Sequence, residues 1–188
     1  MRWLGNLLSC ICLAVSAIMV LGVPVGYAAL PLVPVCSWPV ESTGQGILNV
    51  ATQDTNTTYW FMPIDTSRWK SVVIQGFYPN ARFFNFATSG QRGLLIDTLF
   101  DSDIVPDSGG SNPFTMAPGG GSANASYTVN IGASNFGSPN FLSVAGNRLT
   151  FMVYRVIVPD RGLDRSGGVG VPTVTLVAQD GSVRQLQP

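Results

Sequence analysis

Apolar and polar residues alternate along most of this chain, in short runs that Gly, Pro, Asn and Asp interrupt. Runs of this kind, rich in aromatic and β-branched residues, predict half-buried β-strands. No segment after residue 30 keeps the period of an amphipathic helix. The predicted strands cover residues 46–52, 57–63, 69–79, 81–88, 93–100, 125–133, 148–159, 172–179 and 182–186.

This succession of short strands and turns predicts an all-β fold, an antiparallel β-sandwich, in one domain over residues 46–188. The turn sequences YPNAR (78–82) and QDGS (179–182) predict tight hairpins. The run FMVYRVIV (151–158) is almost wholly apolar, which predicts a central strand covered on both faces.

The N-terminus carries an export pattern, in which Arg2 precedes an uncharged apolar run that ends near the small residues Gly26 and Ala28. This arrangement predicts a signal peptide over residues 1–28, followed by a Pro/Gly/Ser-rich lead over 29–45. The predicted location is therefore secreted or periplasmic. The alternative is a retained anchor, because the run is close to the minimum length that spans a bilayer. Only in that case do we expect contact with a membrane.

Composition narrows the classes of function. Only 11% of the 188 residues are charged, and ten basic residues balance ten acidic ones, so we expect no binding to nucleic acid. The chain has no histidine, which excludes Ser-His-Asp catalysis, Cys-His catalysis and histidine zinc sites. No other catalytic constellation is evident in the sequence, which therefore favours a protein that is not an enzyme.

Cys36 is the one cysteine outside the predicted signal peptide, because Cys10 and Cys12 lie within it. A single cysteine in an exported protein predicts a free thiol, an intermolecular disulfide or a partner cysteine beyond this chain. The sequence ends at Pro188 in a strand-like pattern, which favours a domain truncated at its C-terminus.

Four of the ten carboxylates gather in one short segment, as Asp97, Asp101, Asp103 and Asp107. Calcium prefers oxygen ligands, so Asp101, Asp103 and Asp107 form a candidate calcium site, and calcium is the only cofactor that we expect. The alternatives are a carboxylate pair that hydrolyses glycans and a turn whose aspartates bond their own backbone. Arg155 lies within a predicted strand and needs a partner if it is buried, and Asp97 is the predicted partner in a structural ion pair.

Aromatic residues are frequent in the predicted strands between residues 57 and 88. Adjacent positions on a strand point to opposite faces, so one aromatic residue of each neighbouring pair can be exposed. We take Trp60, Trp69 and Tyr78 as candidate aromatic residues that stack on a ligand. The alternative is that they belong to the core, since strands favour aromatic residues in any case.

The segments ARFFNFATSGQRGLLIDTLFDSDIVPDSGGSNPF and NRLTFMVYRVIVPDRGLDRSGGVGVPTVTL resemble parts of a bacterial domain family of unknown function. The resemblance covers about residues 70–178, although this chain lacks the tryptophan that is usual after the first asparagine of the family pattern. It implies a jelly-roll-like β-sandwich, often exported, and it implies no reaction and no catalytic residue. The matching positions are Asn147, Leu149, Arg155, Pro159 and Pro172.

Together these patterns favour a non-catalytic binding or structural module of the cell envelope or the extracellular space. The expected partner is a glycan or another envelope protein. The alternative is a glycan-active hydrolase that uses the aspartate loop 101–107.

Overall fold

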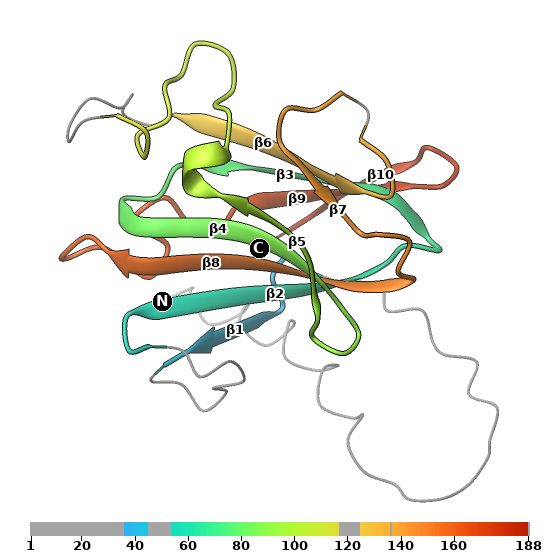
Figure 1. The fold of residues 1–188 in the computed structure, drawn as a ribbon, viewed down its shortest axis with the longest axis horizontal. Coiled ribbons are helices and arrows are strands. Elements are labelled where there is room, and N and C mark those ends of the chain that lie inside the picture. Colours follow the sequence, from blue (N-terminus) through green and yellow to red (C-terminus); the bar gives the residue numbers. More distant parts are fainter. Residues whose placement is uncertain (1–35, 45–53, 117–124, 136, 188) are drawn as a thin grey trace, which may run out of the picture.

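The structure is a computed structural model and describes residues 36–44, 54–116, 125–135 and 137–187. Two five-stranded sheets form a β-sandwich (Figure 1), which confirms the all-β prediction. We name each sheet after its middle strand. The β8 sheet has the order β1 (Val40–Thr43), β2 (Thr57–Asp65), β8 (Leu149–Pro159), β4 (Ala81–Gly90) and β5 (Leu95–Phe100). The β3 sheet has the order β10 (Val183–Leu186), β9 (Thr173–Ala178), β3 (Trp69–Phe77), β6 (Ser126–Gly132) and β7 (Phe141–Ser143).

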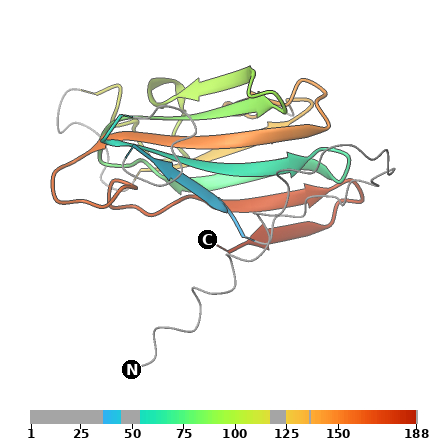
Figure 2. The same cartoon turned by 90° about the horizontal axis from the view of Figure 1, so that it is seen from below.

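Strand pairing is antiparallel throughout both sheets except between β6 and β7, which run parallel. Figure 2 shows the strands of the β8 sheet one beside the next, with β8 between β2 and β4. A short 3-10 helix, η1 (Asp101–Asp103), follows β5 directly. No helix among the described residues is long and apolar enough to cross a membrane.

The core lies between the two sheets, because each strand sends alternate side chains inward. On β2, for example, Trp60 and Met62 are buried, while Tyr59 and Phe61 point to the outer face and are half-buried. The core is unusually aromatic, and such rings remove large apolar areas from water. Its aromatic members are Trp38, Trp60, Tyr78, Phe84, Phe86, Tyr127 and Tyr154.

Two expectations about strand arrangement are wrong. The strand 149–159 is central, as predicted, but its side chains alternate between buried and half-buried, so only one face is covered by the core. Residues 78–82 do not form a hairpin, because β3 and β4 belong to different sheets. Asn80 is instead held by the carbonyl of Gly167, to which it donates its backbone and side-chain N–H groups, both at 3.1 Å. The predicted hairpin around Gly181 is confirmed by the pairing of β9 with β10.

The two ends of the described chain meet. Cys36 forms an isolated parallel bridge with Gln187, and the backbone N–H of Ser37 donates to the carbonyl of Gln187 at 2.8 Å. Cys36 is buried and disulfide-bonded, so it offers no free thiol. β1 lies within the segment predicted as an irregular lead, and the predicted strand 46–52 lies outside the described residues.

Candidate functional site

The aspartate segment forms a structural corner around Asp101. Asp101 is buried, and its carboxylate accepts the backbone N–H groups of Phe84, at 3.2 Å, and Ser102, at 2.7 Å. The β4–β5 ladder ends where Asn85 pairs with Phe100. Beyond this pair, the backbone N–H of Phe84 donates to the Asp101 side chain instead of to a backbone carbonyl of β5. Burial raises the pKa of this carboxyl, and the two backbone hydrogen bonds oppose that rise.

The remaining groups of this corner also bond locally. Asn112 donates its amide to the carbonyls of Asp101, at 2.7 Å, and Ile104, at 2.8 Å, and thereby ties the 3-10 helix to the following loop. Asp103 is exposed, and Asp107 accepts the hydroxyl of Ser126 at 2.8 Å. No group of three or more His, Cys, Asp or Glu in the described part of the chain is placed to hold a metal ion. The calcium hypothesis therefore has no preformed site there and stays a prediction.

The predicted ion pair between Arg155 and Asp97 does not form. Asp97 accepts the backbone N–H groups of Thr98, at 2.9 Å, and Ser143, at 2.8 Å, and so closes the sandwich between β5 and β7. Its ladder partner is Thr88, which points into the core, whereas Arg155 points to the outer face of the same sheet. The two side chains are thus on opposite faces, and Arg155 lies toward solvent rather than in the core.

Two of the three aromatic residues selected from the sequence are buried. Trp60 and Tyr78 are 6% and 5% exposed and belong to the core, which makes them unsuitable for stacking on a ligand. The Tyr78 hydroxyl donates to the carbonyl of Ile104 at 2.7 Å. Trp69 is half-buried and lies beside a hollow at one end of the sandwich, described below.

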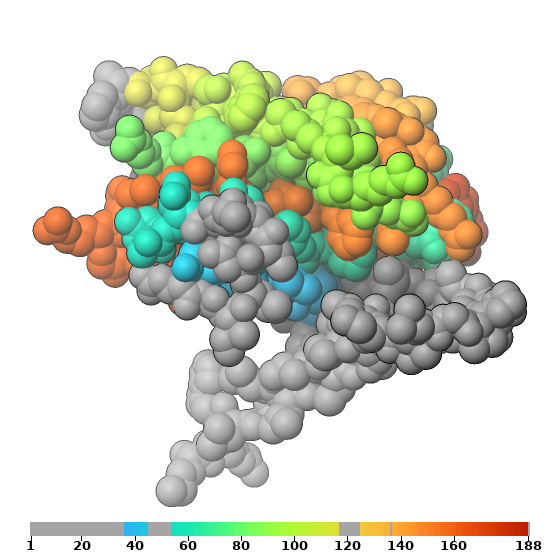
Figure 3. Space-filling view, turned by 60° about the horizontal axis from the view of Figure 1, so that its bottom comes forward, coloured from blue at the N-terminus to red at the C-terminus, as the bar shows by residue number. Residues whose placement is uncertain are grey.

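The outer face of the β8 sheet carries a groove of about 510 Å³. Figure 3 shows this side of the molecule, where residues of β2 (teal), β8 (orange) and β4 and β5 (green) lie side by side. The groove follows from strand parity, because its residues are those that alternate with core residues on four neighbouring strands. It is lined by Tyr59, Phe61, Asn85, Ala87, Ser89, Gly93, Leu95, Thr98, Phe100, Val153 and Arg155.

A chain of hydrogen bonds crosses the groove from β5 to β2. The Thr98 hydroxyl donates to the Phe86 carbonyl at 3.2 Å and accepts the Asn85 amide at 3.1 Å. The side-chain amide oxygen of Asn85 accepts Nε–H of Arg155 at 2.8 Å, and Nη1 of Arg155 donates to the Tyr59 hydroxyl at 3.3 Å. The strand register explains this network, since Arg155 on β8 lies opposite Tyr59 on β2 and Asn85 on β4.

Aromatic rings fix the Arg155 side chain further. Its guanidinium carbon lies 5.6 Å from the ring centre of Tyr59 and 5.2 Å from that of Phe83. The Tyr59 ring in turn stacks on Phe61, with centres 6.0 Å apart and an angle of 9° between planes. The ring of Phe83 contacts the ring of Phe100, with ring centres 6.1 Å apart. A cation between aromatic rings and hydrogen-bonded at two nitrogens is held in one orientation before any ligand arrives.

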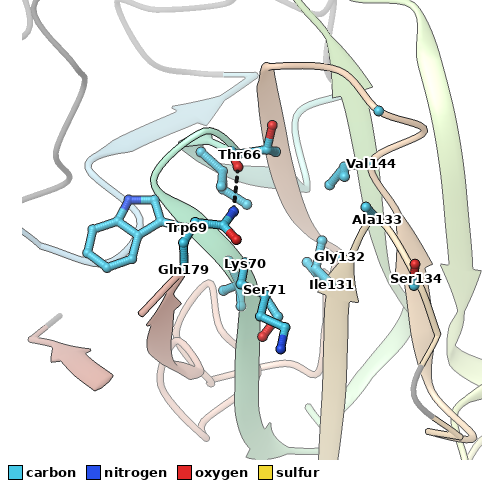
Figure 4. A pocket seen from close by; sticks show the side chains of 13 residues that line it. Thr66, Trp69, Lys70, Ser71, Ile131, Gly132, Ala133, Ser134, Val144 and Gln179 are labelled. Carbon is cyan, nitrogen blue, oxygen red and sulfur yellow. Dashed lines mark hydrogen bonds between the residues drawn. The ribbon is translucent and has the colours of Figure 1, made fainter. Parts of the chain in front are cut away.

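Two other hollows are less suited to a ligand. The first, about 270 Å³, opens at one end of the sandwich between the ends of β2, β3 and β6 (Figure 4). Gln179 closes part of its rim by donating to the Thr66 carbonyl at 3.1 Å. The second, about 510 Å³, lies on the outer face of the β3 sheet. Its polar groups largely bond one another, as Asn130 does when it donates to Ser138 at 2.9 Å.

Sequence reasoning missed Tyr59, Phe61, Asn85 and Thr98 as groove residues. The signal that could have found them is the polar pair Asn85 and Arg155, each inside an otherwise apolar strand. A charged residue in a strand marks the face that does not enter the core, so its cross-strand partners share that face.

Comparisons with known proteins give only weak structural similarity, to uncharacterised proteins. No protein-family model matches the chain, and no curated protein matches it. An uncharacterised protein from Burkholderia cenocepacia is similar over 66% of this chain and 31% of its own, with 18% identity and a TM-score of 0.48. A Vibrio parahaemolyticus protein is similar over 63% of this chain and 30% of its own, with 18% identity and a TM-score of 0.45. The chain spans less than a third of either of these structures, and the family resemblance stays a prediction.

Proposed function

We propose that this protein is a binding module that holds a glycan chain in the groove on the outer face of the β8 sheet. One observation carries the proposal: a half-buried arginine, fixed by hydrogen bonds and aromatic rings, stands in an open groove with apolar walls. Ligand sites commonly combine mainly apolar and aromatic walls with a few fixed polar groups. Sugar rings match such a surface, since they present C–H faces to aromatic rings and hydroxyls to polar groups.

The chemistry of the groove favours binding over catalysis. None of the residues that line it is a carboxylate, a cysteine or a histidine, and the whole sequence has no histidine. General acid–base catalysis needs a titratable group within hydrogen-bond reach of the reacting atoms. Arg155 cannot take this role, because a guanidinium keeps its proton at any ordinary pH.

The shape of the groove also fits an extended ligand. Its lining comes from the four neighbouring strands β2, β8, β4 and β5, so a bound chain would lie across the sheet rather than enter a closed cavity. We place this function outside the cytoplasm, in accordance with the export pattern at the N-terminus. Polysaccharides of an envelope or an extracellular matrix are the ligands available there.

Replacement of one groove aromatic tests the proposal. Phe61→Ala removes a ring from the groove, whereas Phe77→Ala removes an exposed ring from the outer face of the β3 sheet and serves as the matched control. A soluble glycan panel, screened by affinity electrophoresis and followed by calorimetry, should identify a ligand. We expect Phe61→Ala to weaken its binding about tenfold, which corresponds to the loss of one aromatic contact.

The control variant is expected to bind as the unmodified protein does. Equal weakening in both variants would place the ligand elsewhere, and so would an unchanged affinity in Phe61→Ala. If no glycan in the panel binds at millimolar concentration, the proposed function is wrong.

A further inference from the structure

The groove contains a positive charge that no carboxylate of the described residues neutralises. The ion pairs in the described part of the chain join Arg148 to Asp65 and Arg165 to Glu41, and Arg155 takes part in neither. Its hydrogen bonds and ring contacts within the described residues are with Asn85, Tyr59 and Phe83, all of them uncharged. A half-buried cation that lacks a counter-charge attracts an anion more strongly than an exposed one, because less water screens it.

The free polar atoms around Arg155 are hydrogen-bond donors. A guanidinium has five N–H groups and no acceptor. Described residues use two of the five, namely Asn85 and the Tyr59 hydroxyl, and leave three for a ligand. The Tyr59 oxygen accepts from Arg155, so its own hydrogen is directed to another acceptor.

The acceptor oxygens next to Arg155 each already accept one hydrogen bond from a neighbouring side chain. The side-chain amide oxygen of Asn85 accepts from Arg155, and the Thr98 hydroxyl oxygen accepts from the Asn85 amide N–H. The Thr98 hydrogen is in turn directed at the Phe86 carbonyl. The hydrogen bonds therefore lead away from Arg155 on both sides, toward Thr98 on β5 and toward Tyr59 on β2, and the groove centre presents donors to whatever binds there.

From this arrangement we infer that the ligand is an acidic glycan, whose uronic acid carboxylate is bound by Arg155. The inference rests on the proposed function and specifies its ligand class. A carboxylate supplies two acceptor oxygens that match the planar fork of arginine. The rings of Tyr59 and Phe83 hold that fork in place, and the apolar walls accommodate the C–H faces of neighbouring sugar rings.

The test uses the full chain and two forms of one probe. Oligogalacturonate carries a carboxylate on each residue, and its methyl ester has the same backbone without the charge. Calorimetry should show that the acid form binds at least about tenfold more tightly than the ester. Rising salt concentration should weaken binding of the acid form more than binding of the ester.

Variants of Arg155 separate charge from geometry. Arg155→Met removes the charge while keeping an apolar stem, and Arg155→Lys keeps the charge without the fork. We expect Arg155→Met to bind acid and ester equally, and Arg155→Lys to retain part of the preference. Arg184→Met, which changes an exposed arginine on β10 of the other sheet, should behave as the unmodified protein. If Arg155→Met fails to fold, Arg155→Lys and the salt series decide the question.

The outcomes distinguish the two proposals. Equal binding of acid and ester by the unmodified protein, reduced by Phe61→Ala, overturns the acidic ligand and leaves the glycan groove in place. An acid preference that survives in Arg155→Met also overturns the inference. Binding of a peptide through its C-terminal carboxylate, without binding of any glycan, overturns both proposals.

Discussion

Asp101→Ala tests whether the aspartate segment is a structural corner. The substitution removes the acceptor of the Phe84 backbone N–H, which lies on β4 of the β8 sheet, and the Phe84 side chain is fully buried in the core. A buried donor left without a partner costs about 1–3 kcal/mol. The N–H of Ser102 loses the same acceptor, but Ser102 is exposed and water can replace it. We therefore expect the free energy of unfolding to fall by about 1–3 kcal/mol.

The pH dependence of this loss follows from the raised pKa of Asp101. Burial lifts the pKa above its ordinary value of 3.8, so the folded protein holds this proton more tightly than the unfolded chain does. The contribution of Asp101 to stability is therefore largest below pH 3.8 and decreases as the pH rises through the raised folded pKa. Alanine does not titrate and makes no pH-dependent contribution, so the loss of unfolding free energy caused by Asp101→Ala should be larger in acid than at neutral pH.

Urea unfolding at several pH values measures both effects, and Asp103→Ala is the matched control. Asp103 lies in the same turn but is exposed, so its removal should change stability by less than about 0.5 kcal/mol. Equal losses in the two variants, or a loss in Asp101→Ala that grows with rising pH, would refute the structural interpretation. If Asp101→Ala keeps normal stability but abolishes hydrolysis of a glycan, the hydrolase alternative replaces it.

Three further predictions concern the core and the loop. Tyr154→Phe should leave stability unchanged within about 0.5 kcal/mol or increase it, because the buried Tyr154 hydroxyl has only the equally buried Tyr127 hydroxyl nearby and makes no hydrogen bond of good geometry with any described residue; thermal and urea unfolding measure this. Gly76→Ala should cost about 1–3 kcal/mol, since the added methyl would lie 2.7 Å from the Tyr127 hydroxyl; urea unfolding gives the loss. A calcium site in the aspartate loop would raise the melting temperature at millimolar calcium, and Asp103→Asn would abolish that rise, whereas an unchanged melting temperature refutes the calcium prediction.

Alternation in the sequence was sufficient to predict most strands, because each face of a sandwich sheet imposes its own polarity on every second residue. The strand at 57–63, for instance, appears in the structure at 57–65, and that at 172–179 appears at 173–178. β7, at 141–143, was missed. Three residues are too few to show a period.

The arrangement of the strands was not predictable from local signals. The sequence YPNAR has the composition of a hairpin turn, yet it carries the chain from one sheet to the other. What decides the matter is a distant partner: Asn80 donates to Gly167, a residue 87 positions away. Turn composition shows where a chain changes direction, and it contains no information about which strand lies beside it after the turn.

The groove illustrates the same limit at the level of single residues. In the segment TTYWFMP, the aromatic residues Tyr59, Trp60 and Phe61 are equally apolar candidates for the core. A shift of the strand register by one residue would exchange the buried rings with the exposed ones. The choice between them is made on other strands, because pairing with β8 places Tyr59 opposite Arg155, and pairing of β8 with β4 places Arg155 opposite Asn85. Arginine has the largest cost of burial in this set, so its position determines which tyrosine and phenylalanine reach the groove. The apolar strand that suggested a buried ion pair thus forms the middle of the groove, and its arginine faces solvent there, at the centre of the binding surface that we propose.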